Sequence, residues 1–261
     1  MLHQLKVGCT VHPQQSTYQQ MRETWLKVEQ LGADSLWTWD HFFPLYGEAD
    51  GPHFEGYSLL AAMAEVTSTI RFGMMVTCNS YRNPNLLADM ARTIDHISGG
   101  RHILGIGAGW FERDYLEYGY DFKTAPGRLK DLDAAMPIIK NRLAQLNPAP
   151  VNGQIPILIG GSGPKVTLRI TAQHADMWNS GGTPEEYAKK NRILDEWCAK
   201  VGRDPSEIER TLNRTAENLV EQAEEFVAAG ATHFIVDARG PEFDLSLLEA
   251  MLKWRDSQPA V

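Results

Sequence analysis

The sequence predicts an α/β protein, a single (β/α)8 TIM barrel that spans residues 1–261 as one domain. Three observations lead to this prediction: strand-like and helix-like segments alternate, about eight such units follow one another, and no linker or shift of composition divides them. This alternation implies a parallel sheet, because a helical crossover returns each strand in the same direction. Eight units in 261 residues favour a closed barrel over an open doubly wound sheet.

The expected strands are short segments rich in apolar and β-branched residues. They cover residues 7–11, 35–43, 70–77, 102–107, 155–159, 175–179, 208–215 and 233–236. The second lies within SLWTWDHFFP, residues 35–44, where an apolar strand runs directly into Asp40 and His41. An acid and an imidazole at the exit of a buried strand are groups that an α/β enzyme can hold over a pocket.

The expected helices lie between the strands and have apolar residues at helical spacing. They cover residues 18–31, 57–66, 85–97, 128–143, a segment that opens at Pro164, and residues 183–200, 217–229 and 244–254. Pro164 fits the first position of its helix. The sequence from Thr183 to Glu186 has the form of a capping box, and Asp244 caps the last helix.

Composition and charge exclude several classes of function. Hydrophobic residues make up 43% of the chain, and the formal net charge of −8 argues against nucleic acid as the main partner. No apolar run approaches the roughly 20 residues of a membrane helix, and the first residues do not have the form of a signal peptide. Cys9, Cys78 and Cys198 give neither a metal motif nor a disulfide framework. We therefore expect a cytoplasmic protein with no catalytic metal and no membrane partner.

Functional residues of a barrel gather where its strands end. The residues at these ends are mostly polar or glycine: His12, Asp40–His41, Thr77–Cys78–Asn79, Gly107–Ala108–Gly109–Trp110, Gly160–Gly161–Ser162–Gly163 and Asn179–Ser180–Gly181. Charged side chains are scarce among them. Such a rim suits a flat, mostly uncharged ring system held by backbone and amide groups.

The segment from Gly160 to Gly163 is the best phosphate candidate. Its glycines let backbone N–H groups point at an anion, and the following helix adds its positive end. The alternative is a plain strand-to-helix turn. The segment is neither a Walker loop, since it lacks the GK[ST] ending, nor a nucleophile elbow, since Pro164 replaces the last glycine.

The sequence GIGAGW, from Gly105 to Trp110, is not a dinucleotide fingerprint. That fingerprint requires a third glycine one place later, where Trp110 stands. Glycines at alternate positions instead indicate a strand whose backbone a planar ligand can approach closely.

His41 has two interpretations. A lone histidine commonly packs or forms structural hydrogen bonds, but its place beside Asp40 at a strand exit favours a functional role. Imidazole titrates near neutrality and can take or give a proton. Asp40 would either orient this imidazole or hydrogen-bond a cofactor ring. The neighbouring aromatic residues are core by default, and those nearest the rim would wall a substrate pocket: Trp37, Trp39, Phe42, Phe43 and Trp110.

Four motifs, in order along the chain, resemble one family. They are WTWDHF, VTCNSYRNP, GGRHILGIGAGWFERDYLEYG and IPILIGGSGPKVTLRITAQHADMWN, and the similarity extends over about residues 6–179. The chain resembles the bacterial luciferase-like flavin and deazaflavin oxidoreductases. The resemblance implies a luciferase-like (β/α)8 barrel that carries FMN or the deazaflavin coenzyme F420 across its mouth.

The resemblance also implies roles for individual residues. Asp40 and His41 would be catalytic and contact coenzyme and substrate. A non-proline cis peptide bond would join Met75 and Val76. The implied cofactor site comprises Asp40, Met75, Val76, Thr77, Cys78, Asn79, Gly107, Ala108, Gly109, Gly160, Gly161, Ser162 and Gly163, and the substrate side comprises His12, Trp39 and Trp110.

Two positions depart from the family pattern. Trp110 stands near the usual place of a substrate-handling acid, so sugar-phosphate dehydrogenation is not transferred to this chain. Relatives often carry glutamate where Asp114 stands, and we assign Asp114 no role.

These features favour an F420-dependent oxidoreductase that transfers a hydride between the coenzyme and an organic substrate, with His41 as acid or base. The alternative is an FMN-dependent luciferase-like monooxygenase, supplied with reduced flavin by a partner reductase. A third hypothesis, a barrel that only binds or stores a flavin-like ligand, is disfavoured by the Asp40–His41 pair. The resemblance further implies a homodimer.

Overall fold

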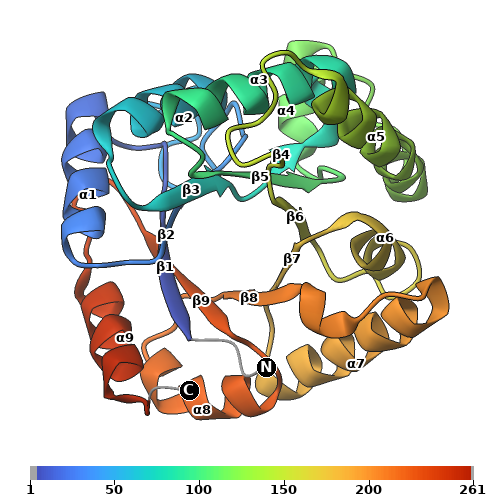
Figure 1. Ribbon diagram of the computed structural model, residues 1–261. Helices are drawn as coiled ribbons and strands as arrows, with labels where there is room; N and C mark the ends of the chain where they lie inside the picture. Colours follow the sequence, from blue (N-terminus) through green and yellow to red (C-terminus); the bar gives the residue numbers. More distant parts are fainter. Residues whose placement is uncertain (1–4, 260–261) are drawn as a thin grey trace.

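The structure is a computed structural model that describes residues 5–259. A ring of parallel strands occupies the centre and helices surround it (Figure 1). The strands are β1 (Lys6–Val11), β2 (Ser35–Thr38), β3 (Arg71–Met74), β4 (Thr77–Cys78), β5 (His102–Gly107), β6 (Ile157–Gly160), β7 (Met177–Ser180), β8 (Glu209–Asn213) and β9 (His233–Ala238). The helices of the described residues are α1 (Tyr18–Gln30), α2 (Gly56–Val66), α3 (Pro84–Ile97), α4 (Glu112–Tyr118), α5 (Ala125–Gln145), α6 (Thr167–His174), α7 (Pro184–Val201), α8 (Leu219–Ala228) and α9 (Ser246–Ser257), with short 3-10 helices η1 (Asn79–Tyr81) and η2 (Pro205–Glu207).

The strands close into a barrel. Their order is β3-β2-β1-β9-β8-β7-β6-β5-β4, and β3 also pairs with β5. The register sets Cys9 of β1 opposite Leu36 on one side and Val236 on the other. The ring closes where Phe72 of β3 lies opposite His102 of β5. Since β3 and β4 are two parts of one barrel strand, the predicted (β/α)8 TIM barrel is confirmed.

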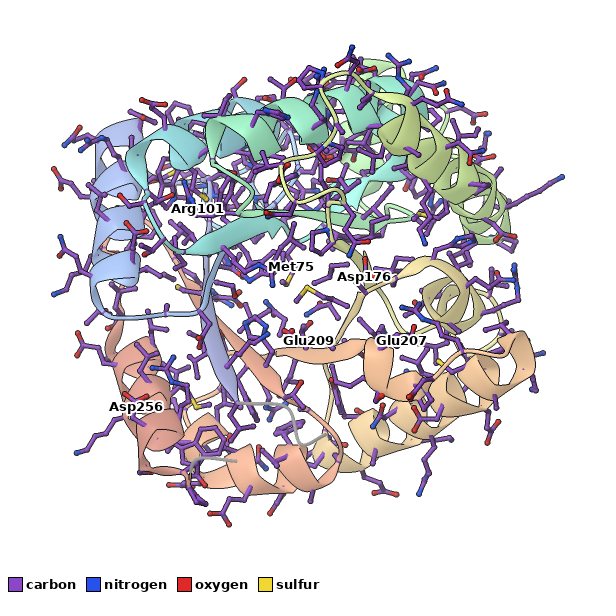
Figure 2. All side chains as sticks on the ribbon, viewed as in Figure 1. Met75, Arg101, Asp176, Glu207, Glu209 and Asp256 are labelled. Carbon is purple, nitrogen blue, oxygen red and sulfur yellow. The ribbon has the colours of Figure 1, made fainter. Side chains whose placement is uncertain are left out.

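The third barrel strand is interrupted, whereas the sequence predicts a continuous strand over residues 70–77. It pauses between Met74 and Thr77, and the intervening Met75–Val76 peptide bond is cis, as the resemblance implies. We call Met75 and Val76 the bulge. Figure 2 shows Met75 within the ring of strands.

The second strand is shorter than predicted. It ends at Thr38, so that Asp40 and His41 lie in the loop that follows it. The carbonyl of Thr38 accepts the amide of Met75 at 2.7 Å, which is the last bond between the second strand and the bulge. The acid and the imidazole are therefore loop residues anchored just beyond a buried strand.

Predictions at the helix ends have mixed outcomes. The capping box at Thr183 is present at the start of α7. The carboxylate of Asp244 accepts the amide of Ser246, the first residue of α9, at 2.9 Å. The placement of Pro164 is wrong, because this residue lies in a turn and α6 begins only at Thr167.

Helix α4 was not predicted. It is short, and it ends at Gly119, whose φ of 71° lies in the left-handed region that favours glycine. Its place directly after β5 brings the side chain of Asp114 back to the barrel mouth.

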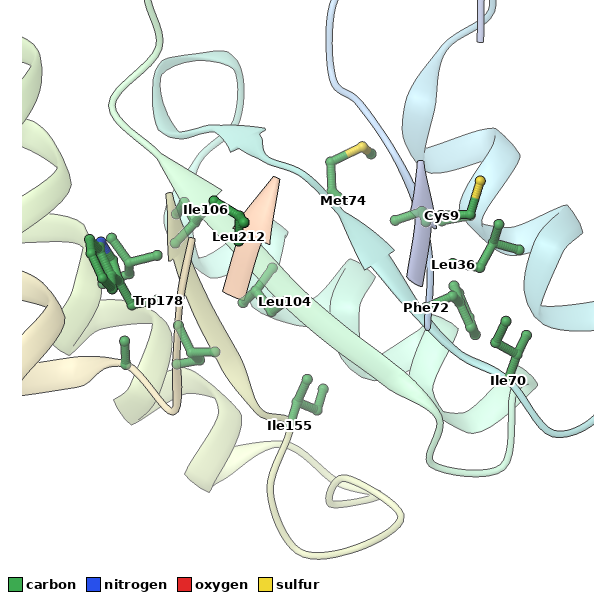
Figure 3. Close-up of a cluster of buried hydrophobic side chains, with 14 of the residues drawn as sticks. Cys9, Leu36, Ile70, Phe72, Met74, Leu104, Ile106, Ile155, Trp178 and Leu212 are labelled. Carbon is green, nitrogen blue, oxygen red and sulfur yellow. The ribbon is translucent and has the colours of Figure 1, made fainter. Parts of the chain in front are cut away.

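Two apolar layers support the barrel. The inner layer fills the ring and consists of Trp37, Ile103, Leu158, Met177 and Ile235, with the bulge packed against it. The outer layer lies between strands and helices and includes Cys9, Leu36, Phe72, Leu104 and Trp178 (Figure 3). Because side chains fill the interior, a ligand can be held only at an end of the barrel.

None of the helices within residues 5–259 has the length and apolar character needed to cross a membrane.

Candidate active site

A cavity of about 350 Å³ opens at the barrel mouth, where the strands end. It is lined by Asp40, His41, Met75, Val76, Thr77, Cys78, Tyr81, Gly107, Ala108, Gly109, Trp110, Leu129, Leu132, Gly160, Gly161, Thr167 and Asn179. Most residues of the predicted cofactor site are in this lining. Asn79, Ser162 and Gly163 are not: the first lies in η1, and the other two lie in the segment before α6.

A second hollow of about 440 Å³ lies beside this cavity and shares Met75 and Asn179 with it. Its other lining residues are Thr10, His12, Trp39, Leu45, Tyr46, Ser180, Gly181, Asn213, Asp237 and Arg239. The predicted substrate residues are therefore divided, since His12 and Trp39 line the second hollow and Trp110 lines the cavity.

His41 is held by a buried carboxylate that reaches it from α4. Its Nδ1 lies 2.7 Å from Oδ2 of Asp114, which is fully buried. Asp114 also accepts the hydroxyl of Tyr81 at 3.0 Å. The amides of Phe42 and Phe43 donate to its other oxygen at 3.0 and 3.2 Å. A carboxylate placed this way selects an Nδ1–H on His41, which leaves Nε2 available to the cavity.

The interpretation that Asp40 orients His41 is wrong, because both oxygens of Asp40 bind Arg82. The guanidinium donates to them at 2.6 and 2.8 Å, and the amide of Cys78 donates at 2.9 Å. Burial raises the pKa of Asp40, and the charge of Arg82 opposes that shift. The pair fixes the segment from Cys78 to Arg82, of which Cys78 and Tyr81 line the cavity.

The bulge forms part of the cavity wall, and glycines of β5 and β6 make room for it. A Cβ on Gly105 would collide with the carbonyl oxygen of Met74. A Cβ on Gly107 or Gly160 would lie 2.8 or 2.9 Å from a methyl group of Val76. The prediction that these glycines admit a planar ligand is therefore corrected at Gly105, where the neighbour is the protein's own backbone.

The predicted phosphate loop, residues 160–163, has partly occupied donors. The amide of Gly161 donates to the carbonyl of Asn179 at 3.0 Å. The hydroxyl of Ser162 accepts Nζ of Lys190 at 2.9 Å, so an ammonium group from α7 lies beside the loop. The predicted contribution of the next helix is weakened, because three residues separate the end of the loop from Thr167, where α6 begins.

Three polar residues of the second hollow contact one another, with His12 between Tyr46 and Asp237. Nδ1 of His12 lies 2.8 Å from the hydroxyl of Tyr46, and Nε2 lies 3.3 Å from Oδ1 of Asp237. Both ring nitrogens of His12 are thus engaged within the protein. Burial raises the pKa of Tyr46 to about 12, so its hydroxyl stays protonated at neutral pH.

Aromatic rings connect the two hollows around His41. The ring of Trp39 lies 4.0 Å from that of His12 and 5.9 Å from that of His41. Its indole N–H donates to Nε2 of His53 at 3.3 Å, and burial lowers the pKa of His53 to about 4, which preserves that acceptor. Trp110 is 63% exposed, and its ring lies 5.6 Å from His41.

Within residues 5–259, no group of three or more His, Cys, Asp or Glu side chains is arranged to hold a metal ion.

Sequence reasoning missed the partners that complete the mouth. They are Tyr46, Tyr81, Arg82, Asp114, Lys190, Asp237 and Arg239. Asp114 lies 73 positions from His41, and Arg82 lies 42 positions from Asp40, so spacing along the chain does not reveal the contacts. The available signal was that Arg82 and Asp114 both lie within motifs that carry the family resemblance.

These features define the class of protein: a (β/α)8 barrel whose mouth combines a bulged third strand, glycine-rich strand ends and an imidazole held by a buried acid. The sequence profile of the luciferase-like monooxygenases matches residues 1–258, and the chain belongs to this family.

Relatives and solved structures add detail. The 5,10-methylenetetrahydromethanopterin reductase of Archaeoglobus fulgidus is 31% identical over 215 residues, which cover 76% of this chain and 60% of that protein. An F420-dependent secondary alcohol dehydrogenase in complex with an F420–acetone adduct has a TM-score of 0.83 at 16% identity, with 98% of each chain covered. The oxygenating constituent of 3,6-diketocamphane monooxygenase from Pseudomonas putida, in complex with FMN, has a TM-score of 0.65 at 17% identity, over 81% of this chain and 67% of that one. At these identities the structural likeness establishes the fold.

Proposed function

We propose that this protein is an F420-dependent oxidoreductase that transfers a hydride between the coenzyme and an organic substrate. The observation that carries the proposal is the pair of His41 and the buried Asp114, 2.7 Å apart at the edge of the cavity. Such a pair fixes the orientation of an imidazole that can take or give a proton. The similarity to a putative coenzyme F420-dependent oxidoreductase of Mycobacterium tuberculosis, 27% identical over 234 residues, supports a deazaflavin as the hydride carrier.

The cavity fits a deazaflavin or flavin ring. Its volume of about 350 Å³ is in the range of small-molecule sites, and the bulge and the backbone of residues 107–109 give it a weakly polar lining. When bound, the coenzyme supplies the hydride chemistry that side chains lack. The chain would hold the ring against Val76, and Ser162 and Lys190 would hold the phosphate.

His41 would move the proton that accompanies the hydride. With an alcohol as substrate, Nε2 accepts the hydroxyl proton while the carbon loses its hydride. In the reverse direction, Nε2–H protonates the oxygen of the carbonyl as its carbon gains the hydride. Asp114 stabilises the imidazolium between these events, and the ring of Trp110 limits the access of water to it.

The second candidate is an FMN-dependent monooxygenase that receives reduced flavin from a partner reductase. It is favoured by the family to which the chain belongs and by the FMN complex among the similar folds. A deazaflavin reacts poorly with oxygen, so substrate-dependent oxygen consumption with reduced FMN would decide for this candidate.

Anaerobic titration with each cofactor separately tests the choice. We expect F420 to bind stoichiometrically, followed by absorbance and by native mass spectrometry, and to bind more tightly than FMN. Tight binding of FMN without any binding of F420 would overturn the F420 proposal. Binding of neither cofactor would overturn both candidates.

The same titration tests the phosphate loop. Lys190→Gln removes the ammonium group beside Ser162 and should weaken cofactor binding about tenfold, as expected for loss of one charge-assisted contact. Lys189→Gln is the matched control, because Lys189 is the preceding, exposed residue of α7. Equal affinities of the two variants would remove Lys190 from the site.

The proposal extends to assembly and compartment. Exposed Leu86 and Ile97 beside a groove between α2 and α3 support a homodimer, and light scattering measures its mass. The free state of Cys9, Cys78 and Cys198 supports a reducing, cytoplasmic location.

A further inference from the structure

The two hollows are neighbours at the barrel mouth and share Met75 and Asn179 in their linings. A molecule that reacts at His41 and is long enough to pass these two side chains would reach the second hollow. This inference rests on the proposed function, because it concerns the substrate of the same site. The question is which chemical group the second hollow is built to receive.

The hydrogen-bonding capacity of the acidic residue in this hollow is taken up by neighbours, which also lower its pKa. Asp237 accepts the hydroxyl of Thr215 at 3.0 Å and the side-chain amide of Asn213 at 3.3 Å, and His12 lies 3.3 Å away. Its side chain is 16% exposed. With its oxygens engaged in this way, Asp237 has little capacity left for a ligand.

Arg239 is different. It is exposed and lines the hollow, yet no acceptor or carboxylate among residues 5–259 binds its guanidinium. The guanidinium lies 5.2 Å from the centre of the Tyr46 ring, a cation–π contact that leaves its N–H donors free to bind a ligand in place of water. An arginine at a cavity edge with a fixed stacking partner and free donors matches the fork geometry of a carboxylate.

The backbone that carries Arg239 is anchored on both sides. The amide of His12 donates to the carbonyl of Ala238 at 3.1 Å, and the amide of Phe243 donates to the carbonyl of Arg239 at 2.9 Å. A Cβ on the next residue, Gly240, would lie 2.8 Å from a backbone oxygen of the β1–α1 loop. The guanidinium is thus attached to a fixed point of the mouth.

We propose that the second hollow binds a carboxylate of the substrate, with Arg239 as its ligand. The rings of Trp39 and Tyr46 and the side chain of Leu45 would cover the apolar part between that carboxylate and the reacting carbon. The substrate class is then an organic acid that bears an alcohol or carbonyl group at a distance from its carboxylate.

Binding of matched acid and amide probes to the cofactor-free protein tests this proposal. The probes are phenylacetate with phenylacetamide, and indole-3-acetate with indole-3-acetamide. The readout is the ¹³C-methyl resonance of Met75, which lines both hollows and is assigned from Met75→Leu. We expect each acid to bind about tenfold more tightly than its amide, and Arg239→Gln to abolish that preference.

Arg192→Gln is the charge-matched control, because Arg192 is exposed on α7 and lines neither hollow. It should retain the preference for the acids. Equal binding of acid and amide to the natural protein, or a preference that survives in Arg239→Gln, overturns the proposal. Since these measurements need no cofactor, failure of the cofactor titration and failure of the carboxylate site are separate results.

Discussion

His41 connects the fold to the proposed chemistry, and its function depends on which nitrogen faces the cavity. Asp114 binds Nδ1, so the proton-transfer role falls to Nε2. Two substitutions separate the roles of the two ring nitrogens. His41→Asn removes Nε2 and keeps the contact with Asp114. Asp114→Asn keeps the imidazole and changes the hydrogen-bond partner of its Nδ1.

His41→Asn should retain an N–H close to the position of Nδ1 while it removes Nε2. We expect turnover to fall at least about a hundredfold, since general acid–base catalysis contributes on the order of 10²–10⁴. Cofactor affinity should change less than about threefold, because the imidazole contacts the substrate side. Steady-state kinetics and cofactor titration measure the two effects. Unchanged turnover would favour the hypothesis of a barrel that only stores its ligand.

Asp114→Asn should lower turnover through the orientation of His41. An amide at this position can present N–H to Nδ1, which reverses the tautomer and places the proton on Nε2. We expect the pH–rate profile to change shape and kcat to fall more than KM rises. Tyr81→Phe removes another donor to the same carboxylate without touching His41 and is the control. A purely structural role of Asp114 would give both variants the same profile.

Several short elements meet around the end of β2, and a buried ion pair joins them. Arg82 follows η1 and binds Asp40 through two contacts, with side chains that are only 10% and 1% exposed. The guanidinium also lies 4.3 Å from the centre of the Tyr57 ring of α2. The loop after β2, the segment after η1 and helix α2 therefore share one point of attachment.

Asp40→Asn should destabilise the fold by about 2–3 kcal/mol, because it leaves a largely buried guanidinium with Glu55, 2.9 Å away, as its only remaining carboxylate partner among the described residues. Asp133→Asn is the matched control. Asp133 binds Arg169 at 2.8 Å but at the surface, and its loss should cost less than about 1 kcal/mol. Urea denaturation of both variants gives the comparison. Equal costs would contradict the structural importance of the pair.

The bulge is accommodated by the backbone of β5, and glycine substitutions test this. Gly105→Ala would drive a methyl group into the carbonyl of Met74, so we expect a loss of at least about 2 kcal/mol or a failure to fold. Gly127→Ala is the control, because a Cβ there meets only ordinary contacts at 3.4 Å in helix α5. It should gain about 0.5–1 kcal/mol. Thermal unfolding measures both, and a mild effect at Gly105 would contradict the close approach.

The order of strands and helices could be predicted from the sequence, whereas the contacts between distant residues could not. The order of strands and helices follows from local periodicity, so the barrel could be predicted. The cis peptide bond between Met75 and Val76 was expected only from the resemblance, and the interruption of the third strand there was not expected, because no local pattern marks it. The partner of His41 could not be found from sequence, since α4 folds back across 73 positions to place Asp114 there. Arg82, the partner of Asp40, was missed for the same reason, because it lies 42 positions away in the chain.

At the end of the barrel opposite the mouth, contacts between polar side chains link four neighbouring strands, β8, β9, β1 and β2. Lys6 lies 2.6 Å from Glu209, and Glu209 lies 2.7 Å from Nδ1 of His233. Nε2 of His233 lies 2.8 Å from the hydroxyl of Ser35, which also accepts the indole N–H of Trp37. Charge pairing at this end serves stability, since functional groups of such barrels gather at the other end.

Glu209, labelled in Figure 2, makes that stability depend on pH. Burial alone would raise its pKa, but the bond to His233 and the charge of Lys6 lower the pKa to about 2. A carboxyl whose pKa is lower in the folded state stabilises the fold above its unfolded pKa of about 4.3 and loses that contribution as the pH falls toward 2. The shift corresponds to about 3 kcal/mol.

Glu209→Gln should therefore reduce the free energy of unfolding most at pH 6–7, and the difference from the natural protein should shrink as the pH is lowered from about 4.5 to 2. Urea denaturation at several pH values measures this difference directly. Glu185→Gln removes the same charge from an exposed position at the start of α7 and should show no such dependence. If the two variants have the same pH dependence, or if the destabilisation by Glu209→Gln grows in acid, the ionised carboxylate of Glu209 does not stabilise the fold.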